Sequence, residues 1–164
     1  DGADITGAGQ KELLARGIAF VPQGRNLFGQ LTVFQNLELG GITLGMKTTH
    51  ARIPEVLEFF PRVKERLHSQ ASALSGGEQK RTAICRALAN KPSLSLGDEP
   101  TGHVDPKTSE HVFHELIALF RGQGVAALIA THNMELAARM DRVLRLEQGV
   151  LVEITPSAVA STVF

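Results

Sequence analysis

Apolar positions along the chain switch between short continuous runs and helix-like spacing, a pattern typical of an α/β domain. Each short run ends at proline or polar residues, as buried strands of a parallel sheet do. The runs predicted as strands are 17–21, 94–97 and 125–130. Apolar residues recur at helical spacing over 32–39 and 51–67, where Pro61 interrupts the second stretch. We therefore expect a mostly parallel sheet flanked by helices, with a small helical lobe over 25–73.

The second half of the chain contains two clear helix starts. Ser75 followed by Glu78 forms a capping box and predicts a helix that runs to about Asn90. Asp105 followed by Pro106 supplies an N-cap and a favoured first helical residue. These signals place two further helices, one before and one after the strand at 94–97.

The last part of the chain predicts a short helix and a hairpin. The helix is expected over about 134–140, and the strands at 143–146 and 150–152 flank a Gln148-Gly149 turn. From Ser157 the sequence is small and weakly patterned, so we expect a fraying end.

Polar residues follow the ends of the three predicted strands. They are Gln23, the pair Asp98 and Glu99, and His132. Ligands of open parallel sheets bind beyond the carboxyl ends of the strands, so we expect these side chains to converge. Such a set suits phosphoryl chemistry: Asp98 would hold Mg²⁺, Glu99 would polarise a water, and His132 would donate to a terminal phosphate. Gln23 would orient water or complete the shell of the metal.

A different kind of site is predicted where Ser75, Gly76 and Gly77 open a helix. Free backbone N–H groups and the helix dipole favour an anion there, and glycine lets a phosphate approach the backbone closely. Each feature also has a plain structural explanation, because Ser75 with Glu78 can simply cap a helix. Asp98 with Glu99 can likewise be an ordinary strand exit, and a single histidine such as His132 is often only a surface residue.

The composition limits the kinds of partner and the cellular compartment that we expect. Seventeen basic residues balance seventeen acidic ones among 164, so no net positive field exists to gather nucleic acid. The single cysteine, Cys85, lies in an apolar helical pattern, which suits a reducing compartment. The longest apolar run is far short of the roughly 20 residues that span a bilayer. We expect a cytoplasmic protein that reaches the inner face of the membrane only through a partner.

Four segments together resemble the ABC transporter ATP-binding subunits, a branch of the P-loop NTPases. They match, in the family's order, its signature, Walker B, D-loop and switch-histidine motifs. The segments are 74–79 (LSGGEQ), 98–100 (DEP), 102–105 (GHVD) and 131–132 (TH). The resemblance covers nearly the whole chain. It implies a partial P-loop NTPase (ABC ATPase) fold with a C-terminal β-hairpin.

The resemblance also implies roles, cofactors and partners. In the family two ATPase subunits sandwich two ATP molecules with Mg²⁺, and each signature contacts the nucleotide of the other subunit. Ser75, Gly76, Gly77 and Gln79 would do so here, and Asp105 would report the state of one site to the other. The implied partners are a second ATPase subunit, identical or different, and an integral membrane transporter subunit, to which Gln23 links the nucleotide site. No nucleic acid is expected.

One departure from the family is large. Its phosphate loop, GxxxxGK[ST], should stand upstream of Gln23, and no such string occurs in these residues. We therefore expect a single ABC ATPase domain over 1–164, N-terminally incomplete, with the signature to the hairpin at 74–154. Without that loop the chain alone should be inactive, whereas a complete protein would be an ATP hydrolase.

Two alternatives stay open. The chain could be a non-hydrolysing remnant or regulatory subunit that supplies its signature to a partner. It could also be a non-transport ABC protein, although the interval from Gln23 to Leu74 is too short for a long coiled-coil insertion. The two halves of the chain also resemble different branches of the family. The front half resembles ATPases of branched-chain amino acid and urea importers. The back half resembles those of lipoprotein release and macrolide export.

Overall fold

The structure is a computed structural model that describes residues 2–24, 26–102 and 104–160. It divides into two compact units, one up to Ile129 and one from Ala130, and each is described by itself. Arg25, the first residue of the predicted lobe, and His103, in the predicted D-loop, lie outside the described residues. The same holds for Asp1 and for residues 161–164 at the ends of the predicted domain.

A three-stranded sheet organises the first unit. Its strands, in the order β1-β2-β3, are Ile18–Val21, Leu94–Asp98 and Ala126–Ala130. β1 and β2 are parallel, and Val21 pairs with Gly97 near their ends. The Ala126 N–H donates to the Ser93 carbonyl at 3.0 Å, so β3 begins beside the start of β2. The predicted parallel sheet is confirmed, with each strand within about one residue of its expected range.

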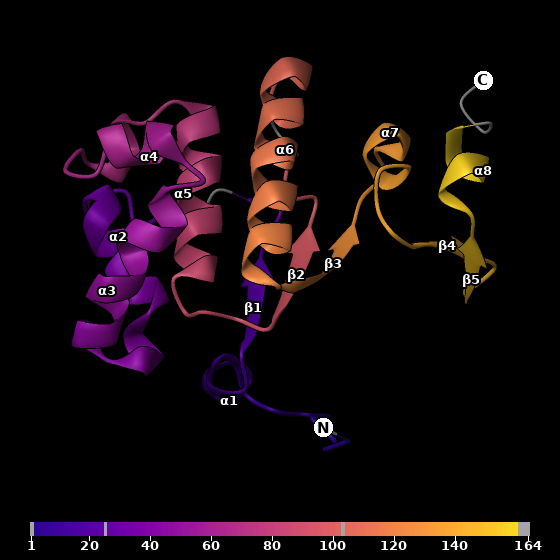
Figure 1. Cartoon of the computed structure of the whole chain (residues 1–164), viewed down its shortest axis with the longest axis horizontal. Coiled ribbons are helices and arrows are strands. Elements are labelled where there is room, and N and C mark those ends of the chain that lie inside the picture. The colour runs from indigo at the N-terminus through magenta and orange to yellow at the C-terminus, as the bar shows by residue number, and fades with distance from the viewer. Residues whose placement is uncertain (1, 25, 103, 161–164) are drawn as a thin grey trace. The chain divides into compact units, whose positions relative to one another are not determined.

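Two long helices pack beside each other on this sheet (Figure 1). They are α5, Gly76–Leu88, and α6, Pro106–Gln123. Their apolar faces and the inward residues of the sheet form a common core with the helical lobe, which includes Val21, Leu37, Phe60, Ile84, Leu88 and Leu116. Alternate positions of the strands point away from this core, and Phe20 and Leu128 are more than half exposed. The sheet is therefore buried mainly on one face.

Short helices fill the predicted lobe between β1 and α5. They are α2 (Val33–Gly40), η1 (Ile42–Leu44), α3 (Met46–Leu57), α4 (Pro61–Glu65) and η2 (Ala71–Ala73). Thr32 and Gln35 form a capping box at the start of α2. The predicted break at Pro61 is confirmed, because Pro61 is the first residue of α4. The start expected at residue 51 was wrong, since α3 begins at Met46 and continues through Pro54.

Local signals were incomplete at both ends of the chain. α1, Gln10–Ala15, was not predicted, and it contains no buried residue that would produce an apolar periodicity. In the second unit α7, Met134–Ala137, is shorter than expected. The prediction of a fraying end was also wrong up to residue 160, because α8, Pro156–Ala160, forms there and Val159 is fully buried.

The predicted hairpin of the second unit is confirmed. β4, Val143–Glu147, pairs antiparallel with β5, Val150–Ile154. Gln148 and Gly149 both have positive φ, 48° and 84°, the backbone of a two-residue hairpin turn whose twist matches the strands. Across the described residues, no helix combines the length and hydropathy that a bilayer crossing requires.

Candidate functional site

The start of α5 is built by its own side chains. The Glu78 N–H donates to Ser75 Oγ at 3.4 Å, and the Ser75 N–H donates to Glu78 Oε2 at 2.8 Å. Arg66 Nε lies 3.2 Å from the other oxygen of Glu78. The bonds to Ser75, and then Arg66, hold the pKa of the Glu78 carboxyl below its ordinary value. The predicted capping box is confirmed.

Helix geometry leaves the first N–H groups of α5, on Gly76 and Gly77, without an intrahelical acceptor. They lie at the positive end of the helix dipole, where an anion is favoured. The Gln79 side chain bonds to the turn before the helix: Nε2 donates to the Leu74 carbonyl at 3.0 Å and to the Ala71 carbonyl at 3.4 Å. Gln79 thus supports the turn before the helix, and its predicted contact with a nucleotide stays a prediction.

Gly77 also has a packing role. A Cβ atom added there would lie 2.7 Å from Thr108 Cγ2, in the first turn of α6. The Thr108 N–H donates to Asp105 Oδ1 at 2.9 Å, so Asp105 is the N-cap of α6 as predicted. The Thr108 side chain, and then its backbone N–H, lower the pKa of the Asp105 carboxyl. The starts of α5 and α6 therefore abut, and Asp105 lies near the candidate anion site of the same chain.

Three of the strand-end residues follow the paired ends of β1 and β2. Val21 is paired with Gly97, and Gln23 and Glu99 each stand two residues further along these adjacent strands. Gln23 and Asp98 are exposed and Glu99 is half-buried. Their predicted convergence at one edge of the sheet is consistent with this register.

Glu99 has an uncommon backbone. Its φ of 44° is in the left-handed region, and its carbonyl accepts the Gly102 N–H at 2.9 Å. The chain therefore turns sharply straight after β2, and the carboxylate does not continue the alternation of the strand.

His132 belongs to the second unit. It is exposed and lies between β3 and α7. Its neighbour Asn133 caps α7 by accepting the Leu136 N–H at 3.2 Å, and the Asn133 N–H donates to Thr131 Oγ1 at 3.1 Å. A place for His132 beside Glu99 stays a prediction.

Two basic residues of α5 reach the loop after β1, and sequence reasoning missed both. Lys80 is 1% exposed, and its Nζ donates to the Gln23 carbonyl at 2.6 Å. Arg86 Nη1 donates to the Asn26 carbonyl at 2.7 Å. A signal existed for Lys80, because it falls four and eight residues before the buried Ile84 and Leu88, on the same helix face.

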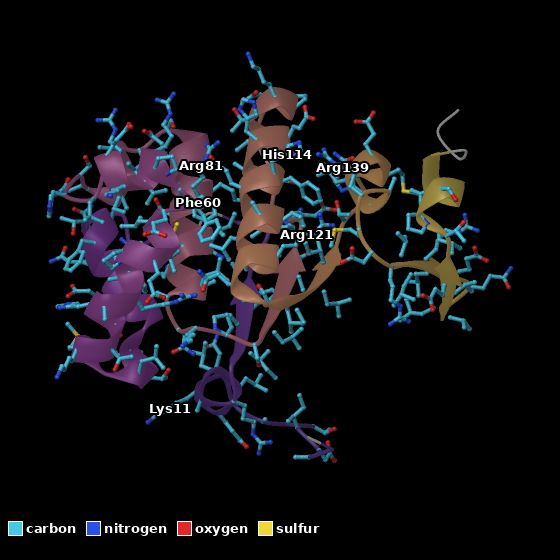
Figure 2. The ribbon with its side chains drawn as sticks, viewed as in Figure 1. Lys11, Phe60, Arg81, His114, Arg121 and Arg139 are labelled. Carbon is cyan, nitrogen blue, oxygen red and sulfur yellow. The ribbon has the colours of Figure 1, made fainter. Side chains whose placement is uncertain are left out.

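α5 is also tied to α6 by an ion pair. Arg81 Nε lies 2.5 Å from Glu115 Oε2, and their side chains are 11% and 24% exposed. The Arg81 side chain is labelled in Figure 2. Cys85 is fully buried, and burial raises the pKa of its thiol, so it packs in the core as predicted.

Within the part of the chain that the structure describes, no group of three or more histidine, cysteine or acidic side chains is arranged to hold a metal ion. Asp98 and Gln23 offer one carboxylate and one amide oxygen at neighbouring strand ends. Mg²⁺ sites on nucleotides typically use one or two carboxylates and draw their other ligands from phosphates and water. The donor set therefore fits a shared Mg²⁺ site and does not form a protein-only one.

Known proteins resemble this chain over most of its length. The model of a family described as ABC transporter matches residues 1–102. The lipoprotein-releasing system ATP-binding protein LolD of Paramagnetospirillum magneticum is 49% identical over 139 residues, 84% of this chain and 61% of that protein. LolD of Ruegeria sp. is 46% identical over 157 residues, 93% of this chain and 69% of that protein. This chain thus spans about two thirds of the length of these relatives, and the likeness includes its front half.

Solved structures show the same fold. An ATP-binding cassette of an ABC transporter in its ADP conformation has a TM-score of 0.81 at 25% identity, covering 97% of this chain and 69% of that one. A cassette from Clostridium perfringens, part of the ABC transporter complex cbiONQ, has a TM-score of 0.80 at 23% identity. That match covers 94% of this chain and 64% of the cassette.

Proposed function

This chain belongs to the ABC transporter family of ATP-binding subunits, and from that premise we propose that it supplies one face of a nucleotide sandwich. Its segment 74–79 would contact ATP held by a second ATP-binding subunit. The observation that carries the proposal is the start of α5, where Ser75 and Glu78 complete a capping box and Gly77 packs on Thr108. The helix end that would face the phosphate is thus held in place by its own chain.

The capping geometry leaves Ser75 able to act on a ligand. Its Oγ already accepts the Glu78 N–H, which uses a lone pair and not the hydroxyl proton. The hydroxyl proton also faces the Glu78 carboxylate, and a rotation of the hydroxyl would redirect it to a phosphate oxygen while the bond from the Glu78 N–H stays intact. The N–H groups of Gly76 and Gly77 point from the same helix end, so one anion could receive all three donors.

The strand-end residues would serve a second nucleotide position, on the chain's own sheet. We assign Asp98 and Gln23 to a Mg²⁺ ion, which when bound would neutralise charge on the phosphates. Glu99 would hold and orient the attacking water and accept its proton. His132 would donate to the terminal phosphate, on the resemblance of residues 131–132 to the switch-histidine motif. Asp105, at the N-cap of α6, would couple the state of one nucleotide position to that of the other.

Hydrolysis at that second position needs a phosphate loop. The 164 residues contain no GxxxxGK[ST] string, whose lysine and backbone N–H groups hold the β- and γ-phosphates. We therefore expect this chain by itself to bind ATP weakly and to turn it over negligibly.

We further propose that the cargo is a lipid-anchored protein. The relatives reported above are named as ATP-binding proteins of lipoprotein-releasing systems, and they match the chain over 84% and 93% of its length. In such a transporter the chain would lie at the cytoplasmic face of the membrane. A membrane-spanning subunit would dock beside Gln23 and the helical lobe, and a second ATP-binding subunit would close the sandwich.

The test is ATP-dependent association. The chain is mixed with a subunit that carries a GxxxxGK[ST] loop and whose catalytic glutamate is replaced by glutamine, so that bound ATP is not consumed. Light scattering should show a one-to-one complex that requires ATP. Ser75→Arg should abolish this complex, because the new side chain fills the place of the phosphate.

The matched control is Ser72→Arg, which adds the same charge to an exposed serine of η2 and should associate like the unaltered chain. Equal association of the Ser75→Arg chain, or no ATP-dependent complex with the unaltered chain, would show that the proposal is wrong.

A further inference from the structure

The buried ammonium group of Lys80 calls for an explanation. Lysine is rarely enclosed, because removing its charge from water is costly unless the charge is well hydrogen-bonded. Lys80 is 1% exposed, and its Nζ donates to the Gln23 carbonyl at 2.6 Å. A short, charge-assisted bond of this kind is stronger than a bond between neutral groups. This buried cation thus contacts the backbone of Gln23, the residue whose side chain is a candidate ligand.

A second basic residue of α5 holds the other end of the same loop. Arg86 Nη1 donates to the Asn26 carbonyl at 2.7 Å, and its guanidinium lies 5.7 Å from the centre of the Phe28 ring. Burial lowers the pKa of Arg86. Phe28 is fixed in turn by Asn36, which accepts its N–H at 3.0 Å and donates to its carbonyl at 3.1 Å. The loop is therefore contacted at two points, at Gln23 by Lys80 and at Asn26 by Arg86.

α5 can transmit a displacement between its start and Lys80. The two points are five residues apart on one continuous helix, which rises about 1.5 Å per residue. The helix is braced on one side by the ion pair between Arg81 and Glu115. On another side Gly40 of α2 comes so close that an added Cβ would lie 1.9 Å from the Arg86 carbonyl oxygen. A rigid, braced helix moves as one body.

We propose that Lys80 is a positioning residue that couples the Ser75 end of α5 to Gln23. A nucleotide phosphate bound at the start of α5 then changes the position of the Gln23 loop in the same chain. This inference rests on the proposed function for the ligand at Ser75. It goes beyond that function because Ser75 serves a nucleotide of the second subunit, whereas Gln23 stands at the strand ends of this chain. Lys80 thereby links two different nucleotide positions.

The resting-state test examines the contact of Lys80 with the Gln23 loop by NMR spectroscopy of the chain without nucleotide or partner subunit. Lys80→Met keeps the length and volume of the side chain but removes the donor. The Gln23 carbonyl ¹³C signal should then shift, and the amide order parameters of Gly24 and Asn26 should fall from about 0.85 towards about 0.6 or less. Lys80→Arg, which keeps a cationic donor, should restore both values. Lys80→Gln takes the place of the methionine variant if the latter does not fold.

Arg52→Met is the matched control, because Arg52 is another buried cation, 4% exposed, whose partners are Glu55 and Gln123. It should leave the signals of Gln23 and Gly24 unchanged. A folded Lys80→Met or Lys80→Gln chain with unaltered Gln23 carbonyl and Gly24 signals would overturn the proposal. Equal changes with Arg52→Met would do the same, because they would mark a general effect of losing a buried cation.

The coupling itself is tested with ATP and the partner subunit described above. In the unaltered chain, complex formation should shift the Gly24 amide signal, and Ser75→Arg should prevent the shift. Lys80→Met should still form the complex but lose at least about three quarters of the shift, and Lys80→Arg should keep it. A full shift in the Lys80→Met complex would refute the coupling. If the unaltered chain forms no ATP-dependent complex, the proposed function fails together with the coupling, and the resting-state result still decides whether Lys80 holds the loop.

Discussion

The hairpin of β4 and β5 contains a larger proportion of apolar residues than helix α5 but buries fewer of its positions. More than half of the positions of α5 are buried, and the buried set includes two basic residues, Lys80 and Arg81. In the hairpin even large apolar side chains are exposed, namely Leu144, Leu146, Val150, Leu151 and Val152. A local pattern therefore predicts which element forms. How much each side chain contributes to stability depends on what packs over it.

The difference follows from what holds each element. α5 is fixed by other parts of the chain: Glu115 of α6, the Gln23 carbonyl and the close approach of Gly40. The hairpin is held by its own strand pairing and by an exposed bidentate ion pair. In this pair Arg142 contacts both oxygens of Glu153, at 2.8 and 3.0 Å. Changes on α5 should thus spread to other elements, and changes on the hairpin should stay local.

The largest expected effect is that of Leu88→Ala in α5. Leu88 is fully buried in the core, so the change removes its burial and leaves a cavity. The free energy of unfolding should fall by about 2–5 kcal/mol, measured by urea denaturation. A loss below about 1 kcal/mol would mean that α5 is less enclosed than the structure shows.

Gly40→Ala should come next. The added Cβ would lie 1.9 Å from the backbone oxygen of Arg86, which cannot move aside as a flexible side chain can. We expect a loss of about 1–3 kcal/mol in the same assay, although alanine by itself favours a helix.

Gly29→Ala is the matched control for this change. A Cβ at Gly29 would make only ordinary contact with Ser72, at 3.5 Å, so stability should change by less than about 1 kcal/mol. Equal effects at the two glycines would contradict a close approach of α2 and α5.

A smaller effect is expected from pH at the start of α5. The pKa of Glu78 is lower in the folded chain, chiefly through its bonds to Ser75. This carboxylate therefore stabilises the fold above its ordinary pKa, and the contribution is lost as the pH falls through the lowered value. Glu78→Gln keeps the capping box but does not titrate, so its unfolding free energy should depend less steeply on pH below about 4.5. If the free energy of unfolding depended equally on pH in the unaltered chain and in Glu78→Gln, Glu78 would not be the source of this stabilisation.

The smallest effect is predicted for Leu146→Ala in the hairpin. Leu146 is 70% exposed, so the substitution that is costly at Leu88 should change stability by no more than about 0.5 kcal/mol here. Denaturation of both leucine variants side by side measures the contrast directly. A cost at Leu146 close to that at Leu88 would show that the hairpin is enclosed, and the comparison of the two regions would be wrong.

Sequence patterns predicted the elements that carry their own start or turn signals. Ser75 with Glu78, Asp105 with Pro106, and Gln148 with Gly149 each act through bonds or backbone preferences within a few residues. Such signals do not depend on the rest of the fold, which is why they could be recognised in advance.

What could not be predicted depends on contacts between distant segments. Lys80 is hydrophilic, and the carbonyl that its buried ammonium group contacts belongs to Gln23, 57 residues earlier. The packing role of Gly77 requires Thr108 on another helix. α8 forms although its sequence is weakly patterned, and its Val159 is buried within the second unit. These features arise from tertiary structure, which local periodicity does not encode.

The left-handed backbone of Glu99 has a practical consequence for mutational scanning of this chain. Side chains branched at Cβ are disfavoured at such a φ, whatever chemistry they carry, whereas asparagine and glycine adopt it readily. A valine or isoleucine variant at this position would thus combine a misfolded turn with the loss of a carboxylate. Glutamine and asparagine variants isolate the chemical contribution, and a comparison of a valine variant with a glycine variant, both without a carboxylate, isolates the turn.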